Sequence, residues 1–301
     1  MNNQRKVRVL ILGATGMLGS TLYRFLSLDH NLEVYGTLRS QKKIEHFSEK
    51  IREGLISGLD LESETGVLFA FSKLRPDVVI NCVGIIKQSP KASDPLESLS
   101  INATLPHRLA NYCRAMGARL IHFSTDCVFS GKKGQYLEDD FADANDLYGR
   151  TKYLGEVSNE NTVTLRTSII GHELDSCISL IDWFLCQEGT VRGFKKAIFS
   201  GLPTIEVARV VRDYILPNQE LMGTYHLSAE PISKYELLKL VAQKYEQSIL
   251  IIPDEDVVID RSLNSGRFQA ATGYSPLPWP ELIESMHVEF GEFHAQDCSP
   301  S

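Results

Sequence analysis

A glycine-rich turn between a short apolar run and an amphipathic segment constrains this fold more than any other sequence feature. Val7 to Leu12 form an apolar run of strand length, and Gly-Ala-Thr-Gly-Met-Leu-Gly follows at 13–19. Apolar residues then recur at helical spacing up to residue 28. Small residues in such a turn let the backbone approach a pyrophosphate, and the helix amino terminus supplies N–H donors and positive potential. We therefore expect a dinucleotide here, held by Gly13, Thr15, Gly16, Met17, Leu18 and Gly19. The alternative is a tight turn that binds nothing.

Short apolar runs alternate with helical patterns through the first part of the chain. After the run at 7–12 we expect strands over Glu33–Leu38, Asp77–Cys82, Arg119–Ser124, Thr162–Ile169 and Gly223–Ser228, and helices over Glu62–Leu74 and Leu96–Met116. Nearly all-apolar strands separated by helices indicate a parallel sheet covered on both faces. The predicted fold is α/β, a Rossmann-type doubly wound parallel sheet, in which ligands bind at the carboxyl ends of the strands.

The alternation weakens after residue 172, where helical patterns and a proline-rich stretch at 276–280 take over. We expect helices over Ser176–Cys186, Ser233–Tyr245 and Glu281–Phe290. The interpretation is a Rossmann domain of residues 1–172 with 200–229, and a smaller, mainly helical substrate-binding lobe of residues 173–199 and 230–293. Residues 294–301 are interpreted as a tail.

Composition argues against some classes of partner. The chain of 301 residues has a formal net charge of −7, whereas nucleic acids and anionic membranes bind best to proteins with a basic surface. The six cysteines, at 82, 113, 127, 177, 186 and 298, lack metal-ligand spacing and indicate free thiols in a reducing compartment. The apolar run after Arg5 and Lys6 is too short for a signal peptide and ends in glycines. We expect no nucleic acid, membrane or metal partner, and a cytoplasmic location.

The end of the second strand indicates which nicotinamide cofactor is bound. NAD sites usually end this strand with an acid that bonds the ribose 2′-hydroxyl, whereas an arginine there accommodates a 2′-phosphate. Here the strand ends in Gly-Thr-Leu-Arg-Ser, with Arg39 followed by Ser40 and no acid in reach. Arg39 can form a charge-assisted fork with a phosphate, so NADP(H) is favoured over NAD(H). The alternative is a solvated loop charge.

Two further segments follow strand ends and are candidates for the rest of the cofactor. We expect Asp60 and Leu61, after a third strand, to hold the adenine. Cys82, Val83 and Gly84 follow the next strand and could line a ribose.

Tyr148 and Lys152 form the most informative pair in the chain. A spacing of four places them on one face of a helix, where the phenol and the ammonium can reach one site. A nearby cation lowers the pKa of a phenol, which can then exchange a proton nearer neutral pH. Thr125, at the end of a strand, would reach the carbonyl oxygen of a substrate from the sheet side, while Tyr148 approaches it from the helix. A glycine turn, then a strand ending in Thr125, then a helix with Tyr148 and Lys152 is an order that predicts a hydride-transfer site. Such a site interconverts a carbonyl and an alcohol. An isolated surface Tyr and Lys is the alternative.

Four segments together carry a family resemblance. They are the glycine turn, Ser-Thr-Asp-Cys-Val-Phe-Ser-Gly at 124–131, Tyr-Gly-Arg-Thr-Lys-Tyr-Leu-Gly-Glu at 148–156 and Leu-Arg-Thr-Ser at 165–168. By these the chain resembles the extended short-chain dehydrogenase/reductase superfamily, and within it most closely the dTDP-4-dehydrorhamnose reductase branch. The resemblance implies that Thr125, Tyr148 and Lys152 are catalytic and that Asn102 supports Lys152. It places Thr167 and Ser168 beside the nicotinamide.

Two departures from that branch lie near the expected substrate. Cys127 stands where the reductases commonly carry Tyr, and Asn-Cys-Val-Gly-Ile-Ile-Lys at 81–87 replaces an Ala-rich segment. The identity of the sugar therefore stays open. The substrate-binding candidates are Lys87, Asp126, Cys127, Arg261 and Arg267, the three cations being offered for a diphosphate. Each of these cations could equally be a solvated surface charge. Segments 260–265 and 273–279 resemble the substrate lobe of sugar-nucleotide reductases.

The expected reaction is reduction of the 4-keto group of a nucleotide-activated 6-deoxyhexose, in the synthesis of precursors for cell-surface polysaccharide. One alternative substrate is a UDP-2-acetamido-2,6-dideoxy-4-keto-hexose. An epimerase or dehydratase is disfavoured, because Cys127 interrupts the acidic pair that elimination uses. The alternative from another class is a non-catalytic, NADP-binding regulatory subunit, since relatives of this branch include one that pairs with methionine adenosyltransferase. The partners expected are a nucleotide-sugar substrate and, if the chain oligomerises, a second copy in a homodimer.

Overall fold

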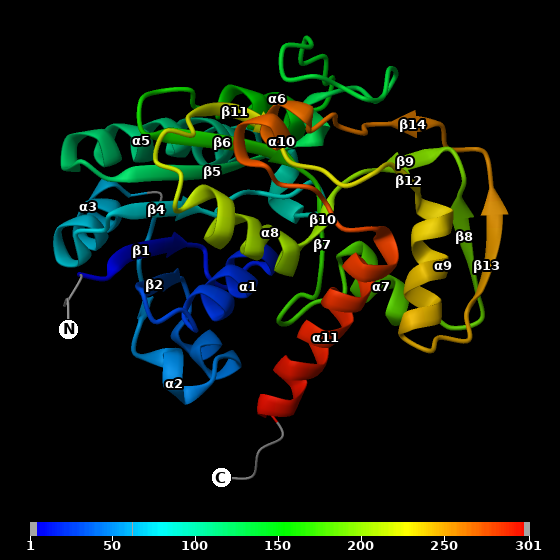
Figure 1. Ribbon diagram of the computed structural model, residues 1–301, viewed down its shortest axis with the longest axis horizontal. Helices are drawn as coiled ribbons and strands as arrows, with labels where there is room; N and C mark the ends of the chain where they lie inside the picture. Colours follow the sequence, from blue (N-terminus) through cyan, green and yellow to red (C-terminus); the bar gives the residue numbers. More distant parts are fainter. Residues whose placement is uncertain (1–4, 62, 298–301) are drawn as a thin grey trace.

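A seven-stranded parallel sheet forms the centre of the computed structural model, which describes residues 5–61 and 63–297 (Figure 1). Its strands are β1 (Val7–Leu12), β2 (Leu32–Leu38), β3 (Leu55–Ser57), β4 (Val78–Asn81), β5 (Arg119–Thr125), β6 (Thr162–Thr167) and β11 (Gly223–His226). Their order across the sheet is β11-β6-β5-β4-β1-β2-β3, and every neighbouring pair is parallel. The Rossmann-type fold predicted from the sequence is confirmed.

Helices cover both faces of this sheet, because its strands are apolar on both sides. On β1, Val9 and Ile11 pack into one core cluster and Leu10 and Leu12 into another. The first face is covered by α1 (Met17–Leu26) and α8 (Thr204–Val210), and the second by α3 (Glu64–Leu74) and α5 (Leu105–Met116). Helix α6 (Leu147–Leu154) packs against β5, and α4 (Pro95–Ser98) packs against α6. Short helical turns lie at η1 (Gln41–His46), α2 (Glu49–Arg52), η2 (Pro90–Ser93) and η4 (Asp126–Val128).

The helix predicted over 96–116 is interrupted by a wider turn. A π-helical segment, η3 (Leu99–Thr104), joins α4 to α5, and a second one, η5 (Val211–Ile215), follows α8. Such wide turns frequently lie at functional sites. Helix α3 begins at Glu64, with Ser63 as its N-cap accepting from the Gly66 N–H at 3.1 Å. The predicted start of this helix, Glu62, lies outside the described residues.

The strand predicted over 162–169 divides in two. After Thr167 the chain leaves the main sheet, and β7 (Ile169–Ile170) pairs with β10 (Leu202–Pro203). The Ser168 carbonyl accepts from the Leu202 N–H at 2.9 Å. A Cβ at Gly201 would lie 2.2 Å from that carbonyl oxygen, so only glycine permits this approach.

The part of the chain interpreted as a smaller lobe contains the three predicted helices, one further helix and short strands that the sequence did not indicate. Its helices are α7 (Leu180–Leu185), α9 (Lys234–Lys244), α10 (Gly266–Thr272) and α11 (Trp279–Asp297). Its strands are β8 (Thr190–Phe194) with β13 (Leu250–Asp254), and β9 (Ala197–Phe199) between β12 (Ile232–Ser233) and β14 (Ile259–Asp260). Helix α11 continues to Asp297, into residues interpreted as a tail. The division into domains stays a prediction.

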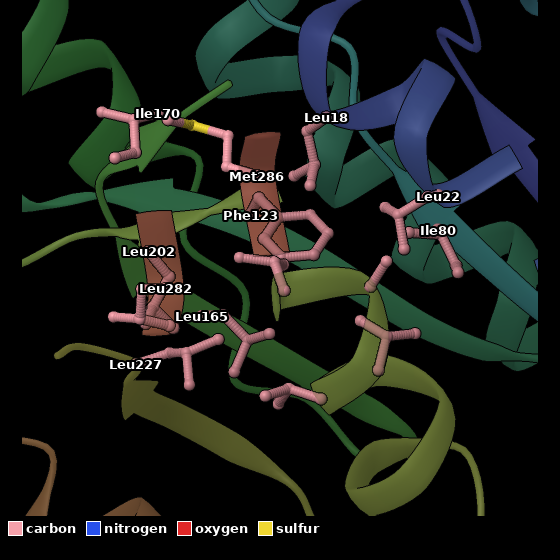
Figure 2. Packing of buried hydrophobic residues seen from close by; sticks show 14 of the residues in the cluster. Leu18, Leu22, Ile80, Phe123, Leu165, Ile170, Leu202, Leu227, Leu282 and Met286 are labelled. Carbon is pink, nitrogen blue, oxygen red and sulfur yellow. The ribbon is translucent and has the colours of Figure 1, made fainter. Parts of the chain in front are cut away.

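The last helix belongs to the core of the sheet. Leu282 and Met286 of α11 lie in the same buried cluster as Phe123 of β5 and Leu165 of β6 (Figure 2). Helix α11 also packs on α8 and α9. The sheet and the carboxy-terminal part of the chain therefore share one hydrophobic core. In the described part of the chain, no helix is both long and apolar enough to cross a membrane.

Candidate active site

The turn after β1 has the geometry that only glycine allows. Gly13 has a φ of +82°, and a Cβ at Gly19 would lie 2.1 Å from the Gly13 carbonyl oxygen. The Gly13 N–H donates to the Thr37 hydroxyl at 3.1 Å, which ties the turn to β2. Gly16 is the N-cap of α1, so no side chain caps the first turn of that helix. A cradle that a Cβ would fill, opening onto an uncapped helix start, fits the pyrophosphate of a dinucleotide.

The residues predicted to select the cofactor lie where β2 and β3 end. Arg39 follows β2 directly, is exposed, and forms no salt bridge with any described residue. Ser40 is the N-cap of η1. Asp60 and the buried Leu61 follow β3, and a Cβ at Gly66 of α3 would lie 2.0 Å from the Asp60 carbonyl oxygen. This close packing holds the segment at the carboxyl edge of the sheet.

Asn102 fixes the loop that follows β4. Its side-chain oxygen accepts from the Ile85 N–H at 2.8 Å, and its amide donates to the Ile85 carbonyl at 3.0 Å. The amide also reaches the Thr151 hydroxyl at 3.5 Å. The resemblance implied that Asn102 supports Lys152. Among the described residues its side chain instead bonds the loop after β4 and the neighbour of Lys152, so its support is indirect.

That loop also closes against the glycine turn. A Cβ placed on Gly13 would meet Val83 at 3.1 Å and the Cys82 carbonyl at 3.4 Å. Cys82, Val83 and the exposed Gly84 thus lie beside the turn predicted to hold the pyrophosphate. Thr167 is buried at the end of β6, and Ser168 follows it half-buried. The structure places both at the same edge of the sheet, two strands from β4.

The three predicted catalytic residues converge at the end of β5. Thr125 is the last residue of that strand and is buried. Helix α6 comes close because Gly149 has no side chain, since a Cβ there would lie 2.3 Å from the Cys127 carbonyl oxygen. Burial raises the pKa of Tyr148, and a hydrogen bond between its phenol and the Thr125 hydroxyl partly offsets that rise. This contact brings the hydroxyl and the phenol together, as the sequence predicts.

Lys152 lies buried one turn further along α6. Its ammonium donates to the Phe123 carbonyl of β5 at 2.7 Å. Burial lowers the pKa of Lys152 to about 8, while the nearby Glu156 and Cys82 act in the opposite direction. Cys82, which affects this pKa, begins the segment predicted to line a ribose, so the ammonium lies towards that segment.

The pKa of Tyr148 differs from the expectation. We expected Lys152 to lower it, but the pKa of Tyr148 is raised, because burial of the phenol outweighs its hydrogen bond with Thr125. Cys127, Asp126 and Asp146 raise it further. The ammonium of Lys152 faces a backbone carbonyl instead. The phenol is therefore protonated at neutral pH, which is the state that a proton donor needs.

A buried ion pair behind this site was not predicted. Arg166 and Glu156 form two parallel hydrogen bonds of 2.8 Å, with their side chains only 6% and 8% exposed. The Ser124 hydroxyl donates to the same carboxylate at 2.7 Å. Arg166 also approaches His226 at 3.3 Å, and burial lowers the pKa of that histidine to about 3. Ser124, Glu156 and Arg166 each lie in a segment that the resemblance used, but their pairing depends on the tertiary fold.

His122 is a second buried polar residue that the sequence did not single out. Its Nδ1 lies 3.1 Å from the Asn81 amide, across the β4–β5 pair. Its Nε2 is buried without a hydrogen-bond partner among the described residues. Burial is the main cause that lowers the pKa of His122, and the charge of Lys152 adds to it, so the ring is neutral.

Three of the five predicted substrate residues gather beside Thr125. Asp126 is buried; burial raises its pKa, while the facing Arg261 lowers it. Burial also raises the pKa of the adjacent Cys127 to about 12. Arg261 reaches this point from the lobe and donates to the Phe129 carbonyl at 2.8 Å. The predicted segment 260–265 is held there because the Asp260 N–H donates to Gly131 at 2.8 Å.

The other two predicted cations lie elsewhere. Lys87 is exposed and donates to Asp146, the N-cap of α6, at 2.9 Å. It therefore lies near the start of α6, the helix that carries Tyr148 and Lys152. Arg267 lies on α10 with its guanidinium 5.2 Å from the ring centre of Tyr225. Tyr225 belongs to the edge strand β11, two strands from β5, so the structure does not bring Arg267 to the cluster at Thr125.

Comparison with known families assigns the chain. The profile of the family described as RmlD substrate binding domain matches residues 7–258. The chain belongs to this family. The resemblance drawn from the four sequence segments is thereby confirmed, and the matched span includes the glycine turn, Thr125, Tyr148 and Lys152.

Relatives of differing description share this fold. The chain is 27% identical over 260 residues to methionine adenosyltransferase 2 subunit beta of Rattus norvegicus, over 79% of this chain and 72% of that protein. The crystal structure of dTDP-4-dehydrorhamnose reductase from Bacillus anthracis in complex with NADP matches with a TM-score of 0.78 and 21% identity, covering 96% and 100% of the two chains. The Bordetella bronchiseptica enzyme WbmG in complex with NAD and UDP matches with a TM-score of 0.77 and 18% identity, covering 98% of each chain.

Proposed function

We propose that this protein is an NADPH-dependent reductase of the 4-keto group of a nucleotide-activated deoxysugar. The observation that carries the proposal is the meeting of Thr125 and a protonated Tyr148 at the end of β5, with the buried ammonium of Lys152 beside them. These groups lie at the sheet edge that also carries the glycine turn. A module that only bound a dinucleotide would have no use for a hydroxyl and a phenol at that edge.

Each catalytic side chain has a separate task. A bound nicotinamide would supply the hydride. Thr125 hydrogen-bonds the carbonyl oxygen and holds it towards the phenol. Tyr148 donates its proton to that oxygen as charge develops there, a contribution of typically about 10²–10⁴-fold for a positioned acid. The buried ammonium of Lys152, held by the Phe123 carbonyl, binds the cofactor ribose.

Arg39 is the basis for proposing NADPH rather than NADH. It is exposed and has no ion-pair partner among the described residues, so its guanidinium is available to a 2′-phosphate. Among the solved relatives, the Bacillus anthracis reductase is in complex with NADP, whereas WbmG is in complex with NAD. The fold therefore accommodates both cofactors, and Arg39 favours the first.

Asp126, Cys127 and Arg261 would contact the sugar nucleotide, since they lie around Thr125. Lys87 would approach its diphosphate from the start of α6 only if its ion pair with Asp146 opens. A UDP-linked 4-keto-hexose is the second substrate candidate, because WbmG is in complex with UDP. A role in polysaccharide precursor synthesis, a homodimer and a cytoplasmic location follow from the same proposal and stay predictions.

A regulatory subunit is the second candidate function. The similarity to methionine adenosyltransferase 2 subunit beta covers 79% of this chain and favours it directly. Such a subunit would bind a nicotinamide dinucleotide without turning over a sugar. It would also associate with a catalytic partner.

The test follows NADPH absorbance at 340 nm with a panel of dTDP- and UDP-linked 4-keto sugars. We expect oxidation of NADPH with at least one of them, and loss of that activity in Tyr148→Phe because the proton donor is removed. NADPH affinity should change little in this variant, since the ring is kept. Tyr153→Phe, on the exposed side of the same helix, is the matched control and should keep full activity. Tight NADPH binding without any turnover would favour the regulatory subunit, and full activity in Tyr148→Phe would refute the assigned donor.

A further inference from the structure

Cys177 and Cys186 lie in contact although their spacing along the chain did not predict a pair. Their sulfur atoms are 2.9 Å apart, and both residues are exposed. Cys177 precedes α7 and Cys186 is its C-cap, so the two thiols bracket this helix. A disulfide needs a sulfur–sulfur distance of about 2.05 Å, so a shift of less than about 1 Å would join them.

The segment that enters α7 crosses the proposed cofactor site. We call residues 171–179 the strap. It leaves the sheet after β6 and β7, yet Asp175 binds Lys43 at 2.7 Å and His46 at 2.5 Å, both in η1 after β2. In the sheet β5, β4 and β1 lie between β6 and β2. The two anchors of the strap therefore lie on either side of β1, which leads into the glycine turn, and in Figure 1 the strap loops from β7 towards α1 before α7 begins.

Helix α7 is coupled to the strap through Asp182. This carboxylate accepts from the Glu173 N–H at 2.6 Å and contacts His172 at 2.5 Å. Glu173 in turn accepts from the N–H groups of Ile178 and Ser179 at 2.9 and 3.0 Å. A bond that restrains α7 therefore also restrains the strap through these contacts.

We propose that Cys177 and Cys186 form a reversible disulfide that locks the strap closed over the dinucleotide site and slows exchange of the cofactor. The cofactor part of this inference rests on the proposed function. The remaining described cysteines are less suited, because Cys113 is buried and Cys82 and Cys127 are partly buried. Burial raises the pKa of all three thiols.

The oxidant is a low-molecular-weight disulfide such as glutathione disulfide. One thiolate attacks a sulfur of that disulfide and releases one glutathione thiol. The second cysteine then attacks the mixed disulfide and releases the other thiol. Two electrons and two protons thus pass from the cysteine pair to the oxidant. The Cys186 contact and the carboxylates of Asp182 and Glu173 raise the pKa of Cys177, so the oxidation should accelerate with rising pH.

The test treats the full chain with defined ratios of glutathione disulfide to glutathione, then traps and maps the thiols by mass spectrometry. We expect an internal Cys177–Cys186 link, reversed by dithiothreitol. Hydrogen exchange of the amides at 172–179 should slow in the oxidised protein, a readout that needs no cofactor. NADPH dissociation, followed by stopped-flow displacement, should slow by about fivefold or more, an effect of the size usual for coupled sites.

Two variants separate the parts of the proposal. Cys186→Ser should form no link and should show the exchange and dissociation rates of the reduced protein under every condition. Asp175→Asn keeps both thiols but loses the anchor on η1, so it should form the link without slowing NADPH release.

Three results would overturn the proposal. They are glutathione adducts without the internal link, a link that leaves exchange at 172–179 unchanged, and a link that slows that exchange without slowing NADPH release. If the reduced protein bound no dinucleotide, the proposed function would fail instead. Hydrogen exchange would then still decide whether the disulfide closes the strap.

Discussion

Arg39 decides how strongly the protein distinguishes the two nicotinamide cofactors. We expect Arg39→Gln to weaken NADPH binding by about 10- to 100-fold, the loss of one hydrogen bond between charged groups. NADH has no 2′-phosphate, so its affinity should stay the same and provides the control. The measurement is the dissociation constant of each cofactor by fluorescence titration. An equal loss for both would show that Arg39 acts on the fold rather than on the phosphate.

Residue identities could be predicted from the sequence wherever a local motif carries them. The positions of Thr125, Tyr148 and Lys152 follow from strand and helix patterns, and the structure brings them to one strand end. The Glu156–Arg166 ion pair could not be predicted from the sequence, because it joins two motifs through a contact that only the folded sheet creates. The direction of the Tyr148 pKa shift was wrong for a related reason. Spacing along a helix cannot show how deeply a phenol is buried.

At the scale of elements, the turn between β1 and α1 depends on one close approach. Gly19→Ala would place a methyl group 2.1 Å from the Gly13 carbonyl oxygen, so the helix must shift. We expect the free energy of unfolding to fall by about 1–3 kcal/mol, the usual cost of overpacking. Dinucleotide affinity should fall as well, because the cradle is displaced. Urea unfolding and NADPH titration measure the two effects.

Gly16→Ala is the matched control for that change. A Cβ at Gly16 meets nothing closer than the Gly13 carbonyl oxygen at 3.6 Å, and the φ of −79° suits alanine. Its free energy of unfolding should stay near that of the unmodified protein. If both variants unfolded alike, the close approach at Gly19 would not be what requires glycine.

The main strands were predictable because they are buried on both faces and their side chains are almost all apolar. The short strands of the lobe were not, since β12 and β14 contain two residues each and their pairing follows from tertiary packing. The wide turn η3 was missed for a different reason. It forms where the Asn102 side chain bonds the Ile85 backbone, and the spacing of apolar residues along the chain does not reveal that contact.

At the scale of the whole molecule, α11 docks through a buried carboxyl group. Glu289 faces Thr21 and Arg24 of α1 and Arg209 of α8, and burial raises the pKa of Glu289 to about 7. The folded protein thus holds a proton that an unfolded glutamate releases above about pH 4.3. Stability conferred by the neutral form is present at low pH and is lost as the pH rises from about 4.5 to 7. At higher pH the loss amounts to about 3 kcal/mol or less.

Glu289→Gln removes this titration while keeping the shape of the side chain. We expect a higher free energy of unfolding than the unmodified protein at pH 8 and no difference at pH 4. The difference between the two curves is the quantity to measure, because the buried His122 and His226 lose stability towards acid in both proteins. Glu281→Gln, exposed at the start of the same helix, should show no pH-dependent difference. If the free energy of unfolding changed with pH in the same way in Glu289→Gln and in the unmodified protein, the assignment of this titration to Glu289 would be wrong.

The shared core in Figure 2 has a consequence for how the chain is made. Synthesis proceeds from the amino terminus, so β5 and β6 leave the ribosome before Leu282 and Met286 exist. One apolar face of the sheet stays incompletely covered until α11 has been synthesised, and such uncovered surfaces promote association between nascent chains. The core on this face of β5 and β6 can therefore close only after α11 has been made.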